Sequence, residues 1–174
     1  MAAAAAQLSS AAGPSTIAAL GIISATTSRG ATRRDAARST WLRLGTGGFA
    51  VRFILRCGKL SASNRASLQA KEGDDVVCID EIPYDEGRLR GPILSLAWWF
   101  AHALEQFPTA KFVCKSDSDV FLNLPDLTLH LEAALAHNAT TAQYAYYGNF
   151  GFFSLVDRAG LGPRRHVVRS AVEA

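Results

Sequence analysis

Apolar and polar positions divide this chain into short apolar runs separated by amphipathic or glycine-ended segments. Short apolar runs bounded by turn residues are typical of buried strands. We predict strands at residues 17–24, 51–57, 75–79 and 111–114, with a further candidate at residues 144–147. Between them, longer periodic segments predict helices at residues 31–44, 61–71, 92–106 and 125–136. Strands and helices therefore alternate along the chain.

Two of the predicted helices have informative faces. In residues 31–44, Arg34, Arg38 and Trp41 follow the i, i+4, i+7 spacing of one helix face. The glycines at 45, 47 and 48 end this helix. In residues 92–106, apolar side chains cover most of the circumference, so we expect that helix to be largely buried. Trp98 and Trp99 are expected to pack within it, and Trp41 to lie in the core.

The alternation predicts an α/β fold with a mostly parallel, Rossmann-like sheet and helices on both faces. We expect one domain over residues 17–150, and we expect that domain to be incomplete. An alanine-rich segment at residues 1–16 is expected to be disordered, and residues 151–174 form a divergent tail.

Composition narrows the class of protein. The chain has 174 residues, of which 49% are hydrophobic and 19% charged, as expected for a folded domain rather than a disordered one. A net charge of +3, without a run of basic residues or zinc-type cysteine pairs, argues against a nucleic-acid module. No segment reaches the roughly 20 apolar residues of a membrane-spanning helix, and the alanine-rich start makes a poor signal peptide.

The three cysteines, Cys57, Cys78 and Cys114, fall in predicted strands. We expect them to be buried thiols, since free cysteine is among the most buried residue types. One disulfide with one cysteine left over is the open alternative, and its pairing cannot be assigned from spacing. Asn138 begins a glycosylation sequon, which matters only in the secretory lumen.

The sequence that follows residues 112–114 carries the clearest candidate chemistry. Asp117, Ser118 and Asp119 come at the carboxyl end of a predicted strand, where parallel sheets bind ligands. In extended backbone, Asp117 and Asp119 would point to the same side. Two carboxylates placed so would bind a hard divalent cation. The alternative is an ordinary solvated turn, in which Asp and Ser are common.

Other acidic positions and motifs are less informative. Asp80, Glu81, Asp85 and Glu86 are expected to form a solvated loop after the third strand, at the same edge of the sheet. A haloacid-dehalogenase-type phosphatase would have its first aspartate directly after the strand, whereas Lys115 and Ser116 intervene here. An EF-hand loop needs glycine at its sixth position, where Leu122 stands.

Two motifs in this order resemble a known family. Residues 33–41 match R-R-x-x-x-R-x-T-W, and residues 110–123 match A-K-F-x-x-K-x-D-D-D-V-F-x-N. Over residues 17–148 the chain resembles the β-1,3-galactosyltransferase-like glycosyltransferases of family 31. The resemblance implies a GT-A fold and an inverting, Mn²⁺-dependent hexosyltransferase. Such an enzyme transfers a sugar, expected to be galactose or N-acetylhexosamine, from a UDP-sugar to a hydroxyl of a glycan, glycoprotein or glycolipid in β-1,3 linkage.

The resemblance also assigns roles to residues. It implies that Asp119 binds Mn²⁺ directly, with Asp117 as a second ligand through a metal-bound water or directed towards the ribose, and with Ser118 beside them in the donor site. We expect Arg33, Arg34 and Arg38 to contact the donor diphosphate, because arginine binds phosphate with two parallel hydrogen bonds. The alternative is a solvated helix face with ion pairs, for instance to Asp35, and we expect at least one of the three to be structural. Members of the family sit in the Golgi membrane on its lumenal side, held by an N-terminal anchor of which this sequence shows no sign.

The sequence departs from the family at three points. Ser118 replaces the middle aspartate, which should leave the metal ligands intact because alternate side chains face away. Pro92 and Ser95 occupy the region where the family often has a lysine. We find no counterpart of the acidic catalytic base, so the catalytic residue is unassigned. An alternative function is therefore a non-catalytic fragment that binds UDP and metal.

Overall fold

A computed structural model describes residues 16–87 and 90–138 of the chain. The chain divides into two compact units, Met1–Ala134 and Leu135–Ala174, and the sheet and its core belong to the first. The strand predicted at residues 144–147 lies outside the described residues. So do the predicted terminal segments, apart from Thr16.

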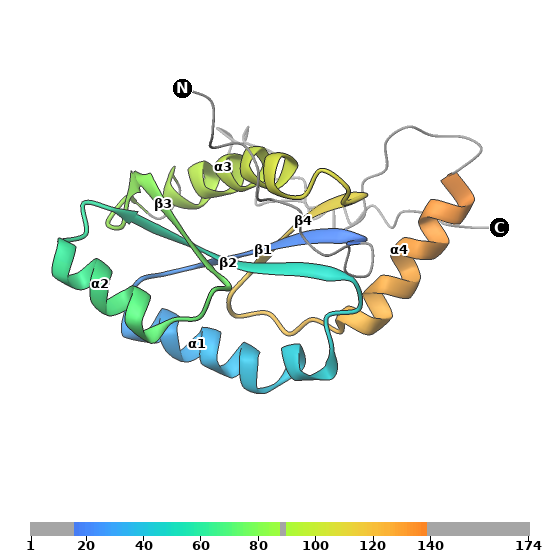
Figure 1. Cartoon of the computed structure of the whole chain (residues 1–174), viewed down its shortest axis with the longest axis horizontal. Coiled ribbons are helices and arrows are strands. Elements are labelled where there is room, and N and C mark those ends of the chain that lie inside the picture. The colour runs from blue at the N-terminus through green and yellow to red at the C-terminus, as the bar shows by residue number, and fades with distance from the viewer. Residues whose placement is uncertain (1–15, 88–89, 139–174) are drawn as a thin grey trace, which may run out of the picture. The chain divides into compact units, whose positions relative to one another are not determined.

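The described residues form one parallel sheet. Its strands are β1 (Ala18–Ser24), β2 (Phe49–Gly58), β3 (Val76–Pro83) and β4 (Phe112–Asp117), in the order β3-β2-β1-β4. All three neighbouring pairs are parallel (Figure 1). The predicted Rossmann-like α/β fold is thus confirmed, and the arrangement is consistent with a GT-A-like fold. The chain builds outwards from β1 to β3 and then returns to add β4 on the other side of β1, so the strand order reverses between β1 and β4.

Helix α1 (Ser28–Ser39) follows β1 directly. Its N-cap is Thr27, whose hydroxyl accepts a hydrogen bond of 3.3 Å from the Gly30 amide. The helix begins earlier than predicted and ends before Thr40, and a 3₁₀ helix, η1 (Trp41–Leu44), continues it. Glycines at 45, 47 and 48 then adopt positive φ angles, which few other residues tolerate. This turn leads the chain into β2.

The remaining helices are α2 (Ala62–Lys71), α3 (Arg90–Gln106) and α4 (Leu124–Asn138). Helices α1 and α3 lie on opposite sides of the sheet (Figure 1). Because side chains alternate along a strand, each face has its own core. One core joins Leu20 and Phe53 to Trp41 and to Leu131 of α4, and the other joins Ile54 and Ile79 to α3.

The prediction that α3 would be largely buried is wrong. Only Gly91, Ser95, Trp99 and Ala103 are buried, at every fourth position. On the opposite side of the helix, Ile93 and Leu104 are 65% and 67% exposed. A helix that covers one face of a sheet touches it along a single stripe, and no described residue covers the other side of α3. None of the described helices is both long and apolar enough to cross a membrane.

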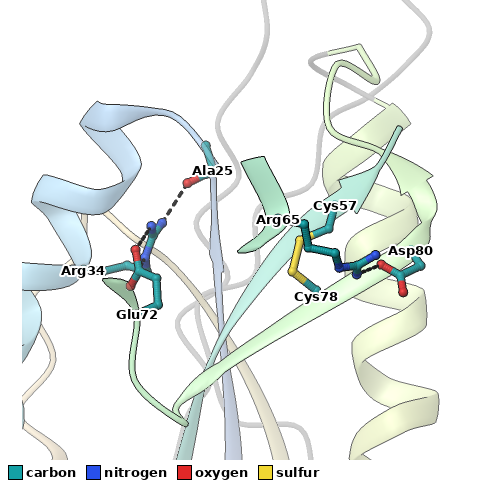
Figure 2. The surroundings of a disulfide bond; sticks show 7 residues. All are labelled: Ala25, Arg34, Cys57, Arg65, Glu72, Cys78 and Asp80. Carbon is teal, nitrogen blue, oxygen red and sulfur yellow. Dashed lines mark hydrogen bonds and ion pairs between the residues drawn. A yellow bond between two sulfur atoms is a disulfide. The ribbon is translucent and has the colours of Figure 1, made fainter. Parts of the chain in front are cut away.

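The expectation of three buried thiols is also wrong. Cys57 and Cys78 form a disulfide between β2 and β3, with their Cα atoms 5.4 Å apart (Figure 2). The parallel register places Cys78 opposite Leu55, so Cys57 lies two residues further along β2 on the same face. Cys114 remains a free thiol, and burial raises its pKa to about 11.

The end of β3 differs from the expected acidic loop. Asp80 and Glu81 belong to the strand, which continues to Pro83 after a register shift relative to β2 between Arg56 and Gly58. A side chain at Gly58 would overlap the carbonyl oxygens of Asp80 and Ile82, so glycine permits this close approach. The Asp80 carboxylate pairs with Arg65 of α2 (Figure 2).

Candidate functional site

The carboxyl ends of β1 and β4 meet at the point where the strand order reverses. There the Ser118 amide donates a hydrogen bond of 3.2 Å to the Ile23 carbonyl. The loop that joins β1 to α1 (residues 25–27, the β1–α1 loop) therefore begins beside the segment that follows β4. Ligands of open parallel sheets bind at such a reversal.

The segment after β4 is a turn rather than extended backbone. The strand ends at Asp117, and the Val120 amide donates a hydrogen bond of 3.3 Å to the Asp117 carbonyl. Ser118 and Asp119 are thus the central residues of a tight turn (residues 117–120, the acidic turn). The expectation that Asp117 and Asp119 point to the same side assumed an extended chain, and the chain is extended only as far as Asp117.

The two carboxylates pair with different cations. Asp117 pairs at 3.0 Å with Lys115, which lies on the same face of β4. Asp119 instead pairs at 3.1 Å with Arg33 of α1. Their side chains are 55% and 56% exposed, so both carboxylates can reach a ligand in solution.

The donor atoms of the acidic turn fit a hard divalent cation such as Mn²⁺. Carboxylates suit Mg²⁺, Ca²⁺ and Mn²⁺, and one or two of them commonly hold such an ion together with substrate phosphates. Within residues 16–87 and 90–138, no group of three or more acidic, histidine or cysteine side chains could hold a metal by itself. An ion bound to Asp117 and Asp119 would take its remaining oxygen ligands from substrate or water.

The three arginines of α1 have different surroundings. Arg33 is one-third exposed and contacts the acidic turn. The Arg34 side chain is fully buried on the other side of α1. Its Nε and Nη2 atoms donate to the two carboxylate oxygens of Glu72, and Nη1 donates to the Ala25 carbonyl at 2.7 Å (Figure 2). Nη1 also donates to Ser24 Oγ at 3.0 Å.

Arg38 joins the same network one helical turn later. It donates two hydrogen bonds, of 3.0 and 2.8 Å, to the carboxylate of Asp75 and one of 2.9 Å to Glu72. It also pairs with Asp35 and lies over the Phe53 ring, 5.0 Å from its centroid. Hydrogen bonds from Arg34 and then Arg38 hold the pKa of Glu72 below its usual value, and the pKa of Arg38 is raised, chiefly by its hydrogen bond to Asp75.

Arg34 and Arg38 are ion-paired, but the expected solvated face is wrong for Arg34, whose side chain is fully buried. The carboxylates of Glu72 and Asp75 balance the two positive charges of Arg34 and Arg38. Arg33 is the arginine of the motif that lies beside the acidic turn. A direct contact of any of the three with a donor diphosphate stays a prediction.

A cavity of about 400 Å³ opens between the β1–α1 loop and α2. Its polar lining is Thr26, Thr27, Ser28 and Arg34 on one side and Asn64, Ser67, Lys71 and Glu72 on the other. Of these residues, only Arg34 was predicted from the sequence to belong to the site. Asn64, Ser67 and Lys71 recur at i, i+3 and i+7, which places them on one helix face and was a detectable signal.

The family comparison covers both the arginine motif and the acidic turn. The galactosyltransferase family model matches residues 32–151, which is more than half of the chain. The match begins within α1 and includes β2, β3 and β4. No curated protein and no solved structure matches the chain.

Proposed function

The chain belongs to the galactosyltransferase family of glycosyltransferases, and we propose that it binds a UDP-sugar at the carboxyl edge of its sheet. In this proposal the sugar, galactose or an N-acetylhexosamine, passes with inversion to a hydroxyl of a glycan, glycoprotein or glycolipid in β-1,3 linkage. The observation that carries the proposal is the position of the acidic turn. It lies at the reversal of strand order in a chain whose family transfers sugars.

The proposed donor site combines the acidic turn with the cavity beside the β1–α1 loop. The first turn of α1 carries unpaired backbone amides, which favour anionic groups such as phosphate. Thr27 and Ser28 lie at this end of the helix and also line the cavity. Arg33 would meet the diphosphate from the side of the acidic turn, because its exposed pair with Asp119 can exchange partners.

Asp119 and Asp117 would hold Mn²⁺ in the proposed site. The bound ion would supply positive charge for the diphosphate that leaves when the sugar is transferred. Arg33 would add a second positive charge and orient the phosphates through its two parallel donors.

We also propose that the domain works on the lumenal side of the Golgi membrane. The Cys57–Cys78 disulfide supports an oxidising compartment, since cytosolic proteins seldom keep such bonds. Peptide mapping without reductant, on protein isolated from cells, should recover Cys57 and Cys78 as one linked pair. Free thiols at both positions in that protein would contradict the lumenal location.

The test of donor binding is a calorimetric titration of UDP with and without Mn²⁺. We expect binding that depends on the ion, and Asp119→Ala should weaken it at least about tenfold by removing a ligand. Asp126→Ala is the matched control, because Asp126 is a similarly exposed carboxylate on α4, away from the acidic turn. Equal binding by the Asp119 variant and the wild type would reject the site.

A second measurement separates transfer from binding. UDP-galactose and UDP-N-acetylhexosamines are incubated with the protein, Mn²⁺ and a panel of glycoside acceptors, and both UDP release and the linkage of the product are analysed. Formation of a β-1,3-linked product supports the enzyme. Metal-dependent binding without release or transfer would instead make this chain a UDP-binding domain without turnover.

A further inference from the structure

We propose that Arg34 is a positioning residue, which fixes the β1–α1 loop and thereby sets the shape of the donor site without touching the donor. The inference rests on the proposed function for what the loop binds. The immobilisation of the loop by Arg34 can be tested without any ligand.

The contacts of Arg34 join three elements at one point. Its guanidinium donates to Ser24 at the end of β1, to the Ala25 carbonyl in the loop and to Glu72, the C-cap of α2. Four of the five N–H donors of arginine are accounted for by these bonds. Arg34 and Glu72 also line the cavity, but the Arg34 side chain is fully buried, so a phosphate in the cavity could contact it only if it gave up protein partners.

Gly30 supplies independent evidence that the loop is held tightly against α1. A Cβ at this position would overlap the carbonyl oxygen of Ala25, the same atom that accepts from Arg34 Nη1. The loop backbone at Ala25 therefore lies directly against the helix at Gly30, and the same peptide group accepts a hydrogen bond from Arg34. Both features constrain one peptide group, which leaves the loop little room to shift.

The loop fixed in this way contributes to both parts of the proposed site. Thr26 and Thr27 line the cavity, and Thr27 caps α1. Directly before the loop, the Ile23 carbonyl accepts from Ser118 in the acidic turn. A shift of the loop would therefore move the cavity wall and the first turn of α1. It would also change the position of the acidic turn, which is hydrogen-bonded to Ile23.

Arg38 provides a comparison within the same helix. It shares Glu72 with Arg34 and is likewise paired in a network, but its other hydrogen bonds go to Asp75 and Asp35. No hydrogen bond links Arg38 to the β1–α1 loop. Substitution of either arginine should lower the stability of the fold. Only substitution of Arg34 should increase the mobility of the β1–α1 loop.

The experiment compares Arg34→Lys with Arg38→Lys. Lysine keeps the charge, but its single ammonium cannot reproduce the planar fork that reaches Glu72 and the loop at once. Hydrogen exchange of the Gly30 and Ala31 amides, which donate to the hydroxyl and the carbonyl of Thr27 in the loop, is followed without ligand as the measure of loop exchange. UDP affinity is measured with Mn²⁺ at a temperature where both variants are folded. We expect loop exchange to rise at least about tenfold in Arg34→Lys and the UDP dissociation constant to rise by a similar factor. In Arg38→Lys, loop exchange should stay within about threefold of the wild type.

Ser24→Ala keeps the proposal testable if Arg34→Lys does not fold. It removes one partner of Arg34 near the loop and leaves the ion pair with Glu72 intact. We expect a smaller rise in loop exchange, with a parallel rise in the UDP dissociation constant.

The outcomes separate the two proposals. Faster loop exchange confined to Arg34→Lys and Ser24→Ala supports positioning even if the wild type binds no UDP, a result that would reject the proposed function alone. Unchanged loop exchange in these variants, or equal changes in Arg38→Lys, would overturn the positioning role. A fall in UDP affinity without any change in loop exchange would also overturn it, because that result indicates direct contact with the donor.

Discussion

Arg33 and Arg34 are neighbours in one helix, yet they are placed in opposite surroundings. Arg34 is fully buried and donates four hydrogen bonds to Glu72, Ser24 and Ala25. Arg33 is one-third exposed and has an ion pair with Asp119 at the acidic turn. The buried arginine is committed to protein groups, whereas the exposed one can exchange its partner for a ligand. Two neighbours in one sequence motif thus differ in how far their side chains are committed to protein partners.

The physical basis of this division is solvation. Breaking a buried ion pair leaves a charge without water or a partner, while the two members of an exposed pair are simply rehydrated. Mutations on the Arg34 side should therefore change the free energy of unfolding, and mutations on the Arg33 side should change ligand affinity with little effect on stability.

The largest fall in the free energy of unfolding is expected from Glu72→Ala. The substitution leaves Arg34 buried without its bidentate partner and also removes one partner of Arg38. Losses of this kind are about 3–5 kcal/mol. Urea denaturation followed by circular dichroism should show a loss in that range. The matched control is Asp35→Ala, which removes an exposed partner of Arg38 and should cost no more than about 0.5 kcal/mol. Equal losses in the two variants would remove the distinction between buried and exposed pairs.

A smaller fall in the free energy of unfolding is expected from Gly30→Ala. Whether this substitution destabilises or stabilises the protein depends on the space next to Gly30. Alanine in a helix interior is favoured over glycine by about 1 kcal/mol, so the substitution would stabilise an unobstructed helix. Here the new Cβ would overlap the backbone oxygen of Ala25. We expect a net loss of about 2 kcal/mol, in line with overpacked interior sites. Gly87→Ala is the control, because an added Cβ there meets no atom within 4 Å. A stabilised Gly30→Ala variant would show that the loop does not lie tightly on α1.

Much of the fold is encoded locally and was predictable. The apolar runs identified all four described strands, and their alternation with helices indicated a parallel sheet. The acidic turn was found because a strand with two aspartates after it is a local pattern. Its geometry was not predictable in the same way, since period two holds only while the chain stays extended and β4 ends at Asp117.

The features that the sequence did not reveal depend on contacts between distant residues. Glu72 looks like an ordinary residue at the end of a helix, and its partner Arg34 lies 38 positions earlier. The disulfide depends on the register of β2 against β3, which spacing alone does not give. The exposed face of α3 was missed for the same reason. Apolar residues lie all round this helix, and the sequence does not show which of them pack against another part of the protein.

The pH dependence of stability should distinguish the buried network from the exposed pair. The folded-state pKa of Glu72 is lowered by Arg34 and Arg38, so its contribution is present above the unfolded pKa and is lost as pH falls through the folded value. Unfolding free energies measured across the acidic range should decline more steeply for the wild type than for Glu72→Gln, which has no carboxyl to titrate. Parallel curves for the two proteins would show that the network does not hold Glu72 ionised in the folded state.

The smallest effect on stability is expected from Arg33→Ala. The ion pair that it removes is exposed, and such pairs contribute about 0.2–1 kcal/mol. Alanine is also the better helix former, so the net change should be about 0.5 kcal/mol or less, and it should shrink in about 1 M salt as charges are screened. UDP affinity with Mn²⁺ should nevertheless fall about tenfold in the same variant, because a charge-assisted phosphate contact is lost. Arg43→Ala, at an exposed position of η1, is the control for the loss of one positive charge and should leave UDP affinity within about twofold. A large loss of stability in Arg33→Ala, or unchanged affinity, would mean that Arg33 is a structural residue like Arg34.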